Sequence, residues 1–317
     1  MAEAVVELAG TSSARRRASV VGWTAAIASA CAFGTSGAFA KPLLASGWSA
    51  GAVVAIRLGL AALVLLIPGL IALRGRWHLL RSHWRPLAAY GVFGGATAQV
   101  AFFNSVQYVP VALGLLLEYL GILLVVAWVA LRTRRLPTRL TVLGMGVAIA
   151  GLVVVLDPAG MGALDPRGVA WGLLAAFGLA TYFVISAQPM ELPPLTFVAV
   201  GLAVGTVAIL LAGAVGLMPL RATTADVVFI GVTLPWWVPL VELALVAAAA
   251  AYALGFVGVQ HLGSTVASFV GLTEVLFAVG WAWILLGELP GTAQLMGGVV
   301  MLAGVAAVQR GQVDGTS

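Results

Sequence analysis

Charged residues are scarce in this chain. Aspartate, glutamate, lysine and arginine together make up only 9% of the 317 residues, whereas 62% are hydrophobic. This composition supplies too little polar surface to coat a water-soluble globule of that size. The scarcity excludes an ordinary soluble domain and indicates a protein embedded in a lipid bilayer.

Cysteine and histidine are also nearly absent. The single cysteine, Cys31, excludes an internal disulfide framework and a cysteine metal cluster. The three histidines are scattered and have no cluster of acidic residues near them in the sequence, so we expect no metal site. The chain also lacks the HExxH, nucleophile-elbow and Walker motifs. We therefore expect no cofactor, and any transport would have to draw on gradients.

Long apolar runs fill most of the sequence. About ten of them have roughly 20 residues, the length that a helix needs to cross about 30 Å of hydrocarbon. The runs are continuous, without the alternation of barrel strands, so they predict helices. Nearly every proline lies between the runs or near their ends, where it disrupts no helix. The predicted spans are Val21–Ala40, Ala50–Leu73, Leu87–Val106, Val111–Leu131, Leu140–Leu156, Gly168–Ala187, Leu195–Leu217, Leu240–Gln260, Ser264–Leu286 and Thr292–Val308.

Positive charges gather in alternate connections. One side would carry Arg15, Arg16, Arg17, Arg74, Arg76, Arg81, Arg85, Arg132, Arg134, Arg135, Arg139 and Arg310, and the other only Lys41, Arg167 and Arg221. By the positive-inside rule, the tails of residues 1–20 and 309–317 are both expected in the cytoplasm. The first residues make a poor signal peptide, so we expect the first span to be retained. Arginines that flank membrane spans explain the net charge of +5, so no nucleic-acid partner is expected.

The two halves of the sequence resemble each other. The matching positions, in the same order in each half, are Ala32–Gly34 with Ala176–Gly178, Gln107 with Gln260, and Glu118 with Glu274. Five spans in each half would force the second copy to enter the membrane from the opposite side. The sequence therefore predicts an all-α integral membrane protein of ten helices, arranged as two inverted five-helix repeats over residues 21–157 and 165–308. Many secondary transporters have this architecture.

Four stretches carry a resemblance to a known family. They are "AFGTSGAFAK" in the first span, "AIRLGLAALVLL" in the second, "VQYVPVALGLLLEYLG" entering the fourth, and "STVASFVGLTEVLFAVGWAWILLGE" in the ninth. From Trp23 to Val308 the chain resembles the EamA-type permeases of the drug/metabolite transporter superfamily. The resemblance implies a multi-pass protein of the bacterial cytoplasmic membrane with a central cavity lined mainly by spans 1, 3, 4, 6, 8 and 9. Many members follow the membrane glutamate closely with proline, and here neither Glu118 nor Glu274 is followed in this way.

Two glutamates lie inside predicted spans. Burying an ionised carboxylate in the middle of a membrane costs at least about 2.5–3.5 kcal/mol, so such a group should face the protein interior, pair, or be protonated. Glu118 is thus a candidate proton carrier or binding point for a substrate amine, or else a hydrogen-bonded structural group. Glu274 shares one helix stripe with Ser268, which suits either a cavity wall or close helix packing. Glu242 and Glu288 lie at span ends and are expected to be structural.

Other polar residues in the spans are further candidates. Arg57 lies inside the second span, where it could reach the interface, pair with a carboxylate or contact an anionic substrate. Gln99 and Gln107 are spaced so that both could face one cavity, and Tyr252 occupies the position of Gln99 in the second half. Interhelical hydrogen bonding would explain these amides equally well. A last pair, Thr35 and Ser36, lies between two glycines and suits either a cavity or a tight helix crossing.

These features together favour a secondary transporter. The stretch "VPVALGLLLEYLG" also resembles amino-acid exporters of this family, so the resemblance implies export of a small metabolite such as an amino acid. We expect transport by alternating access, with protons as a candidate second partner. An energy-independent facilitator is the alternative within transport. A membrane enzyme that modifies lipids would need a cluster of His, Asp or Cys at membrane depth, and the acids of this chain are too scattered to form one. The sequence therefore predicts no enzyme activity.

Overall fold

The computed structural model describes residues 19–105, 107–109, 111–156, 165–229, 231–286 and 291–314. The first half contains a helix over Ser19–Ala45 whose second part is α2 (Ser36–Ala45), followed by α3 (Ala50–Leu73), α4 (His78–Ser82), α5 (Trp84–Ala89), the π-helix η1 (Tyr90–Thr97), α6 (Ala98–Ser105), α7 (Val111–Tyr119), α8 (Gly121–Thr133) and α9 (Arg139–Leu156). The second half contains α10 (Pro166–Ser186), α11 (Pro194–Ala214), β1 (Val227–Phe229), β2 (Val232–Leu234), α12 (Trp237–Ala244), the π-helix η2 (Leu245–Ala250), α13 (Ala251–Gly271), α14 (Thr273–Leu286) and α15 (Thr292–Asp314).

Several of these helices are long and apolar enough to cross a bilayer. Within the described ranges there are six of them: Ser19–Ala45, Ala50–Leu73, Gly114–Thr133, Pro166–Ser186, Pro194–Ala214 and Trp237–Gly271. Three shorter apolar helices cover Arg139–Val155, Thr273–Leu285 and Leu295–Gly311. The protein is therefore a multi-pass membrane protein. Each predicted span falls on helical segments, and the number of ten crossings remains a prediction.

The ends of the chain and of its spans differ in places from the sequence prediction. Most of the predicted tail 1–20, the join between the two predicted repeats, and Glu288 lie outside the described residues. The predicted tail 309–317 is helical as far as Asp314, because α15 continues to that residue. The first span does not end at Ala40, since α2 runs through Pro42 to Ala45.

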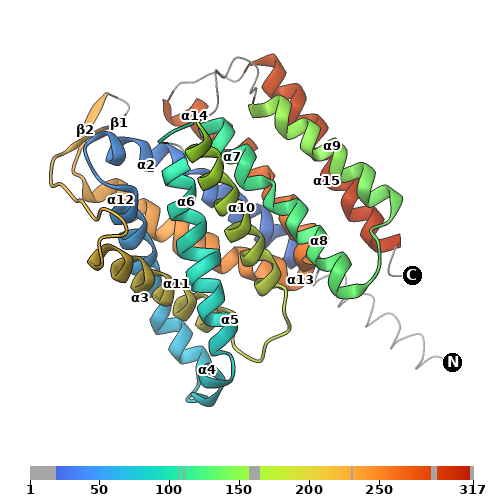
Figure 1. The fold of residues 1–317 in the computed structure, drawn as a ribbon, viewed down its shortest axis with the longest axis horizontal. Helices are drawn as coiled ribbons and strands as arrows, with labels where there is room; N and C mark the ends of the chain where they lie inside the picture. Colours follow the sequence, from blue (N-terminus) through green and yellow to red (C-terminus); the bar gives the residue numbers. More distant parts are fainter. Residues whose placement is uncertain are drawn as a thin grey trace.

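A small β-hairpin is the exception to the helical architecture. β1 and β2 pair antiparallel in the connection between α11 and α12, with Val227 opposite Leu234. The strands are rich in β-branched residues, which favour extended backbone. Gly231 lies between the two strands and has a φ of +74°, a conformation that residues with a side chain rarely adopt. The hairpin and α4 lie at opposite ends of the bundle (Figure 1).

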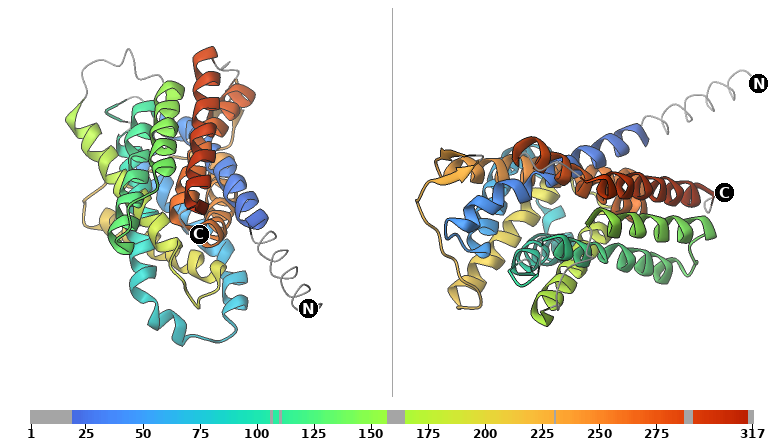
Figure 2. Two further views of the ribbon diagram at one scale, coloured as in Figure 1. Left: turned by 90° about the vertical axis from the view of Figure 1, so that its right-hand side faces the viewer. Right: turned by 90° about the horizontal axis from the view of Figure 1, so that it is seen from above.

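Helices from the two halves pack together in pairs. α9 lies along α15 at one edge of the molecule (Figures 1 and 2), and α3 lies along α11. Glycines permit the close approach of α9 and α15. A Cβ atom on Gly151 would lie 2.3 Å from the backbone nitrogen of Met301, and one on Gly304 would lie 2.3 Å from that of Ala148. Small residues at such contacts are typical of packing between membrane helices.

The chain reverses direction at Gly263, inside the range of α13. This residue has φ +76° and ψ 164°, which is outside the helical region. The contacts with the first helix are those of Gly258 with Ala26, His261 with Gly22, and Glu274 with Gly34. α13 therefore runs along the first helix toward its start, turns at Gly263 and returns. The turn separates the predicted eighth and ninth spans where the sequence placed their boundary.

Irregular helical segments recur in both halves. A π-helix interrupts the third span of the first half as η1 and the third span of the second half as η2. The fourth span is broken at Leu120, between α7 and α8, and its counterpart is broken at Leu272, between α13 and α14. Neither break contains a proline. π-helical turns and interrupted membrane helices occur frequently at functional sites.

Candidate functional site

A cavity lies in the middle of the bundle, between the two broken helices. It contains about 940 Å³ of empty space, part of which is open to solvent. Its walls come from the first helix, α6, α7, α10, α13 and α14, with smaller contributions from α3 and η1. These helices correspond to the spans 1, 3, 4, 6, 8 and 9 that the resemblance in the sequence predicts.

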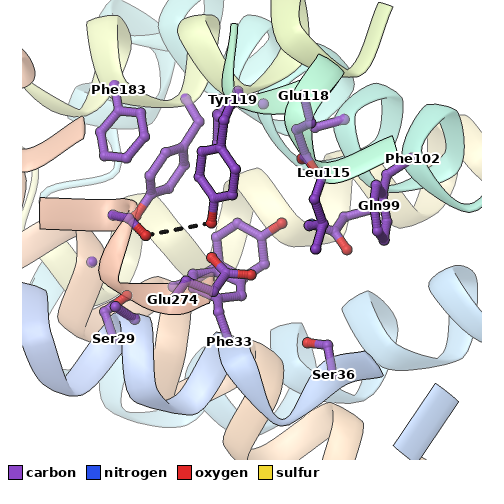
Figure 3. A pocket seen from close by; sticks show the side chains of 18 of the residues that line it. Ser29, Phe33, Ser36, Gln99, Phe102, Leu115, Glu118, Tyr119, Phe183 and Glu274 are labelled. Atoms are coloured by element: carbon purple, nitrogen blue, oxygen red, sulfur yellow. Dashed lines mark hydrogen bonds between the residues drawn. The ribbon is translucent and has the colours of Figure 1, made fainter. Parts of the chain in front are cut away.

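Two glutamates face this cavity from different halves of the chain. Glu118 is near the end of α7, two residues before the break at Leu120, and Glu274 is near the start of α14, two residues after the break at Leu272. Glu118 is 8% exposed, and Glu274 is partly exposed. Within the part of the chain that the structure describes, neither carboxylate has a cationic nitrogen within 4.0 Å. The breaks thus place two carboxylates without direct ion pairs around one space (Figure 3).

Arg57 reaches the cavity wall from α3 and is only 1% exposed. Its guanidinium donates one hydrogen bond to Oε1 of Gln99 at 3.0 Å and another to the carbonyl of Ala247 in η2. It also interacts electrostatically with Glu118, Glu274 and the nearby Glu242. The buried guanidinium therefore joins α3 to the third spans of both halves and supplies a positive charge beside the carboxylates.

Tyr119 is a cavity residue that sequence reasoning missed. Its side chain points from α7 toward Glu274 (Figure 3). The hydroxyl also donates to the carbonyl of Gly271 at 3.4 Å. That carbonyl lacks its usual helical partner, because the N–H of Val275 bonds to Leu272 instead. Tyr119 thus connects the two helix breaks across the cavity. Its position next to Glu118 was the signal that could have identified it.

Aromatic side chains form much of the remaining wall. Tyr252 is 2% exposed and packs edge-on against Phe33 with ring centroids 4.9 Å apart. Phe102 and Phe183 line other parts of the cavity. Apolar walls with a few convergent polar groups are typical of small-molecule sites.

Six of the nine sequence-predicted site residues line this cavity. They are Glu118, Glu274, Gln99, Tyr252, Arg57 and Ser36. The Ser36 hydroxyl is buried and has no hydrogen-bond partner among the described residues. Which of these residues contact a ligand remains a prediction.

The other three predicted site residues lie elsewhere. Gln107 follows the end of α6 and is exposed, with its amide bonded to Asn104 and Phe103. Ser268 is fully buried, donates to the carbonyl of Thr265 and does not line the cavity. Thr35 is buried at the interruption of the first helix, where its hydroxyl lies 2.6 Å from Oε1 of Glu242. The hydrogen bonds of these three residues fit a structural role, which the sequence allowed as an alternative to a place in the cavity.

The site offers no cluster of metal ligands. In the described ranges, no group of three or more His, Cys, Asp or Glu side chains comes together. The arrangement can instead bind a small solute between two carboxylates, a guanidinium and several aromatic rings.

Comparisons with known proteins identify the family of the chain. Residues 20–157 and again residues 166–309 match the EamA-like transporter family. The "Uncharacterized transporter YdfC" of Bacillus subtilis (strain 168) is 30% identical over 171 residues, which make up 51% of this chain and 51% of that protein. The chain thus matches about half the length of that relative. A solved structure described only as "Crystal structure of protein" has a TM-score of 0.73 and 20% identity, covers 92% of this chain and 96% of its own, and shows the fold alone.

Proposed function

The chain belongs to the EamA-like transporter family, and we propose that it is a secondary transporter that exports small amphipathic metabolites, such as amino acids, across the cytoplasmic membrane. The single observation that carries this proposal is the central cavity, which Glu118 and Glu274 line together with aromatic side chains. Such a site binds and releases a solute without converting it, so we propose no enzyme activity. The sidedness of the arginine-rich connections supports two cytoplasmic termini.

Alternating access through two inverted repeats is the proposed mechanism. It is supported by the family match, which occurs once in each half. Further support comes from the recurring π-helices, from the two broken helices, and from the pairing of α3 with α11 and α9 with α15. Equivalent halves that exchange conformations can open one central site to either side of a membrane in turn.

Proton coupling is proposed for the two cavity carboxylates. Burial disfavours the ionised form of a carboxylate, and an opposing positive charge favours it. Glu118 and Glu274 experience both influences, because they lie in the bundle interior within the electrostatic range of Arg57. A proton and a substrate amine would then compete for the same oxygen atoms. The inward proton gradient could in this way drive outward movement of the solute.

The test is metabolite profiling of cells that express the unaltered protein, Glu118→Gln, or neither, at matched membrane abundance. We expect one class of small metabolites to accumulate in the medium only with the unaltered protein. Glu191→Gln is the matched control, because Glu191 is exposed in the connection between α10 and α11, away from the cavity. Reconstituted proteoliposomes with and without a pH gradient then measure the coupling.

Other outcomes separate the alternatives. If Glu118→Gln abolishes accumulation against a gradient but still equilibrates the solute, the carboxylate couples transport to protons. If the unaltered protein only equilibrates the solute, it is an energy-independent facilitator. Conversion of a lipid or solute without flux would contradict transport and favour a membrane enzyme.

A further inference from the structure

The charges around the cavity are unequal in number. Glu118 and Glu274 contribute two carboxylates, whereas Arg57 is the only cationic side chain among the described lining residues. When both carboxylates are ionised, the lining carries a net charge of one negative. An uncompensated charge in a poorly solvated site is unfavourable, and a ligand with one positive charge removes it.

The carboxylates are also more accessible than the guanidinium. Arg57 is 1% exposed, and two of its three nitrogens donate to Gln99 and to the Ala247 carbonyl. Glu118 is 8% exposed, and its carboxylate makes no hydrogen bond or ion pair with any described residue. Glu274 is partly exposed and interacts with Tyr119. A ligand can therefore approach a negative oxygen in this cavity much more readily than a positive nitrogen.

The walls around these carboxylates suit an apolar body. Phe33, Phe102, Phe183 and Leu115 contribute rings and methyl groups to the same space (Figure 3). Aromatic faces also attract ammonium groups. The lining thus combines two anionic acceptors for an ammonium with surfaces for an aromatic or aliphatic side group.

We infer that the cavity selects primary amines that lack a carboxylate over the zwitterionic amino acids with the same side chain. This inference rests on the proposed function and changes its example, because within small amphipathic metabolites it favours amines in place of amino acids. A zwitterion brings no net charge, so the lining would keep its negative excess. Its carboxylate would also lie close to Glu118 and Glu274, where like charges repel, without an accessible cation to bind it.

Three probes that share one benzyl group and one ammonium test the inference. They are phenethylamine, which lacks a carboxylate, phenylalanine, which has one, and phenylalanine methyl ester, which has its bulk without its charge. Binding to the purified full chain in lipid nanodiscs is measured by isothermal titration calorimetry. We expect the amine and the ester to bind at least about ten-fold more tightly than phenylalanine. Equal or tighter binding of phenylalanine would overturn the inference.

The variants Glu118→Gln and Glu274→Gln locate the binding. Each is expected to weaken phenethylamine binding by about ten-fold or more, whereas the exposed control Glu191→Gln leaves it unchanged. Size-exclusion profiles confirm that the variants remain folded, and the comparison of the three probes on the unaltered protein needs no variant. Unchanged phenethylamine binding in both cavity variants would place the ligand elsewhere and overturn the inference.

The inference and the proposed function fail in different ways. If no probe binds while metabolite profiling finds another exported solute, the substrate class is wrong and transport stands. If the amine and the ester bind selectively but no solute crosses the membrane, the binding preference is supported and the transport proposal fails.

Discussion

At the scale of single residues, Arg57 has the most demanding position in the protein. Its guanidinium is almost completely buried and satisfies the Gln99 amide oxygen and the Ala247 carbonyl. It also supplies the positive charge near Glu118 and Glu274. The same side chain therefore stabilises helix packing and the charge balance of the cavity.

Replacing this arginine tests the first role. In Arg57→Met the Gln99 amide oxygen and the Ala247 carbonyl lose this donor, which should lower stability by about 1–3 kcal/mol. Thermal unfolding of the purified variant in lipid nanodiscs measures the loss.

The exposed arginine of α4 provides the control, since Arg81→Met should change thermal stability little. An equally small change for Arg57→Met would contradict the role of the guanidinium in helix packing.

At the scale of helices, the two breaks are connected through one hydroxyl group. Tyr119 donates to the Gly271 carbonyl, which the break at Leu272 leaves without its helical donor, and points toward Glu274 (Figure 3). A connection between two interrupted helices across the cavity would have to change when the cavity opens. We therefore propose that Tyr119 positions the two helix breaks relative to each other.

Tyr119→Phe removes this connection and keeps the ring. We expect solute flux in proteoliposomes to fall several-fold, because the Gly271 carbonyl loses its donor and the two breaks are no longer joined. The stability loss should be on the order of 1 kcal/mol. Tyr108→Phe is the control, since Tyr108 is 42% exposed beyond the end of α6. An unchanged flux in Tyr119→Phe would reduce the role of the hydroxyl to packing.

The contact between α9 and α15 gives a second prediction for helices. In Gly151→Ala the new methyl group would meet the backbone of Met301, so we expect destabilisation of about 1–3 kcal/mol. Gly146→Ala, in the same helix, meets open space and should be neutral or stabilising by up to about 1 kcal/mol. Thermal unfolding of the purified variants measures both. Equal stabilities would show that the two helices can separate without cost.

At the scale of the whole molecule, the ends of the described chain lie on the same side. The start of the first helix and the end of α15 are found at one end of the bundle (Figure 2, right panel). α4, which belongs to an arginine-rich connection, lies opposite the β-hairpin (Figure 1). This arrangement agrees with the sidedness that the arginines predict.

Cysteine labelling tests the orientation. Because Cys31 is the only cysteine, Cys31→Ser provides a cysteine-free background. In that background, Thr233→Cys in the exposed hairpin should react with a membrane-impermeant maleimide in intact cells. Arg81→Cys should react only after the cells are permeabilised. The reverse pattern would contradict cytoplasmic termini.

Much of the architecture could be predicted from the sequence. The apolar runs located helical segments over every predicted span, and the resemblance to the EamA-type permeases is confirmed by the family match. The breaks at Leu120 and Leu272 were not predicted, because they lack the proline that would have signalled them. The first span was predicted to end at Ala40, before Pro42, because proline usually disrupts a helix. In the structure α2 tolerates Pro42 and continues to Ala45.

The sequence by itself determined that the chain enters a membrane, where its helices lie and which connections carry positive charge. These properties depend on how favourably each residue transfers from water to lipid. That transfer free energy depends on the residue type, so the composition and the order of residues along the chain are enough to predict them. Only the tertiary structure decided that Gln99 faces the cavity while Gln107 does not, and that Tyr119 reaches Glu274. The direction in which a helix faces depends on contacts with helices far away in the sequence, and spacing along one helix does not contain that information.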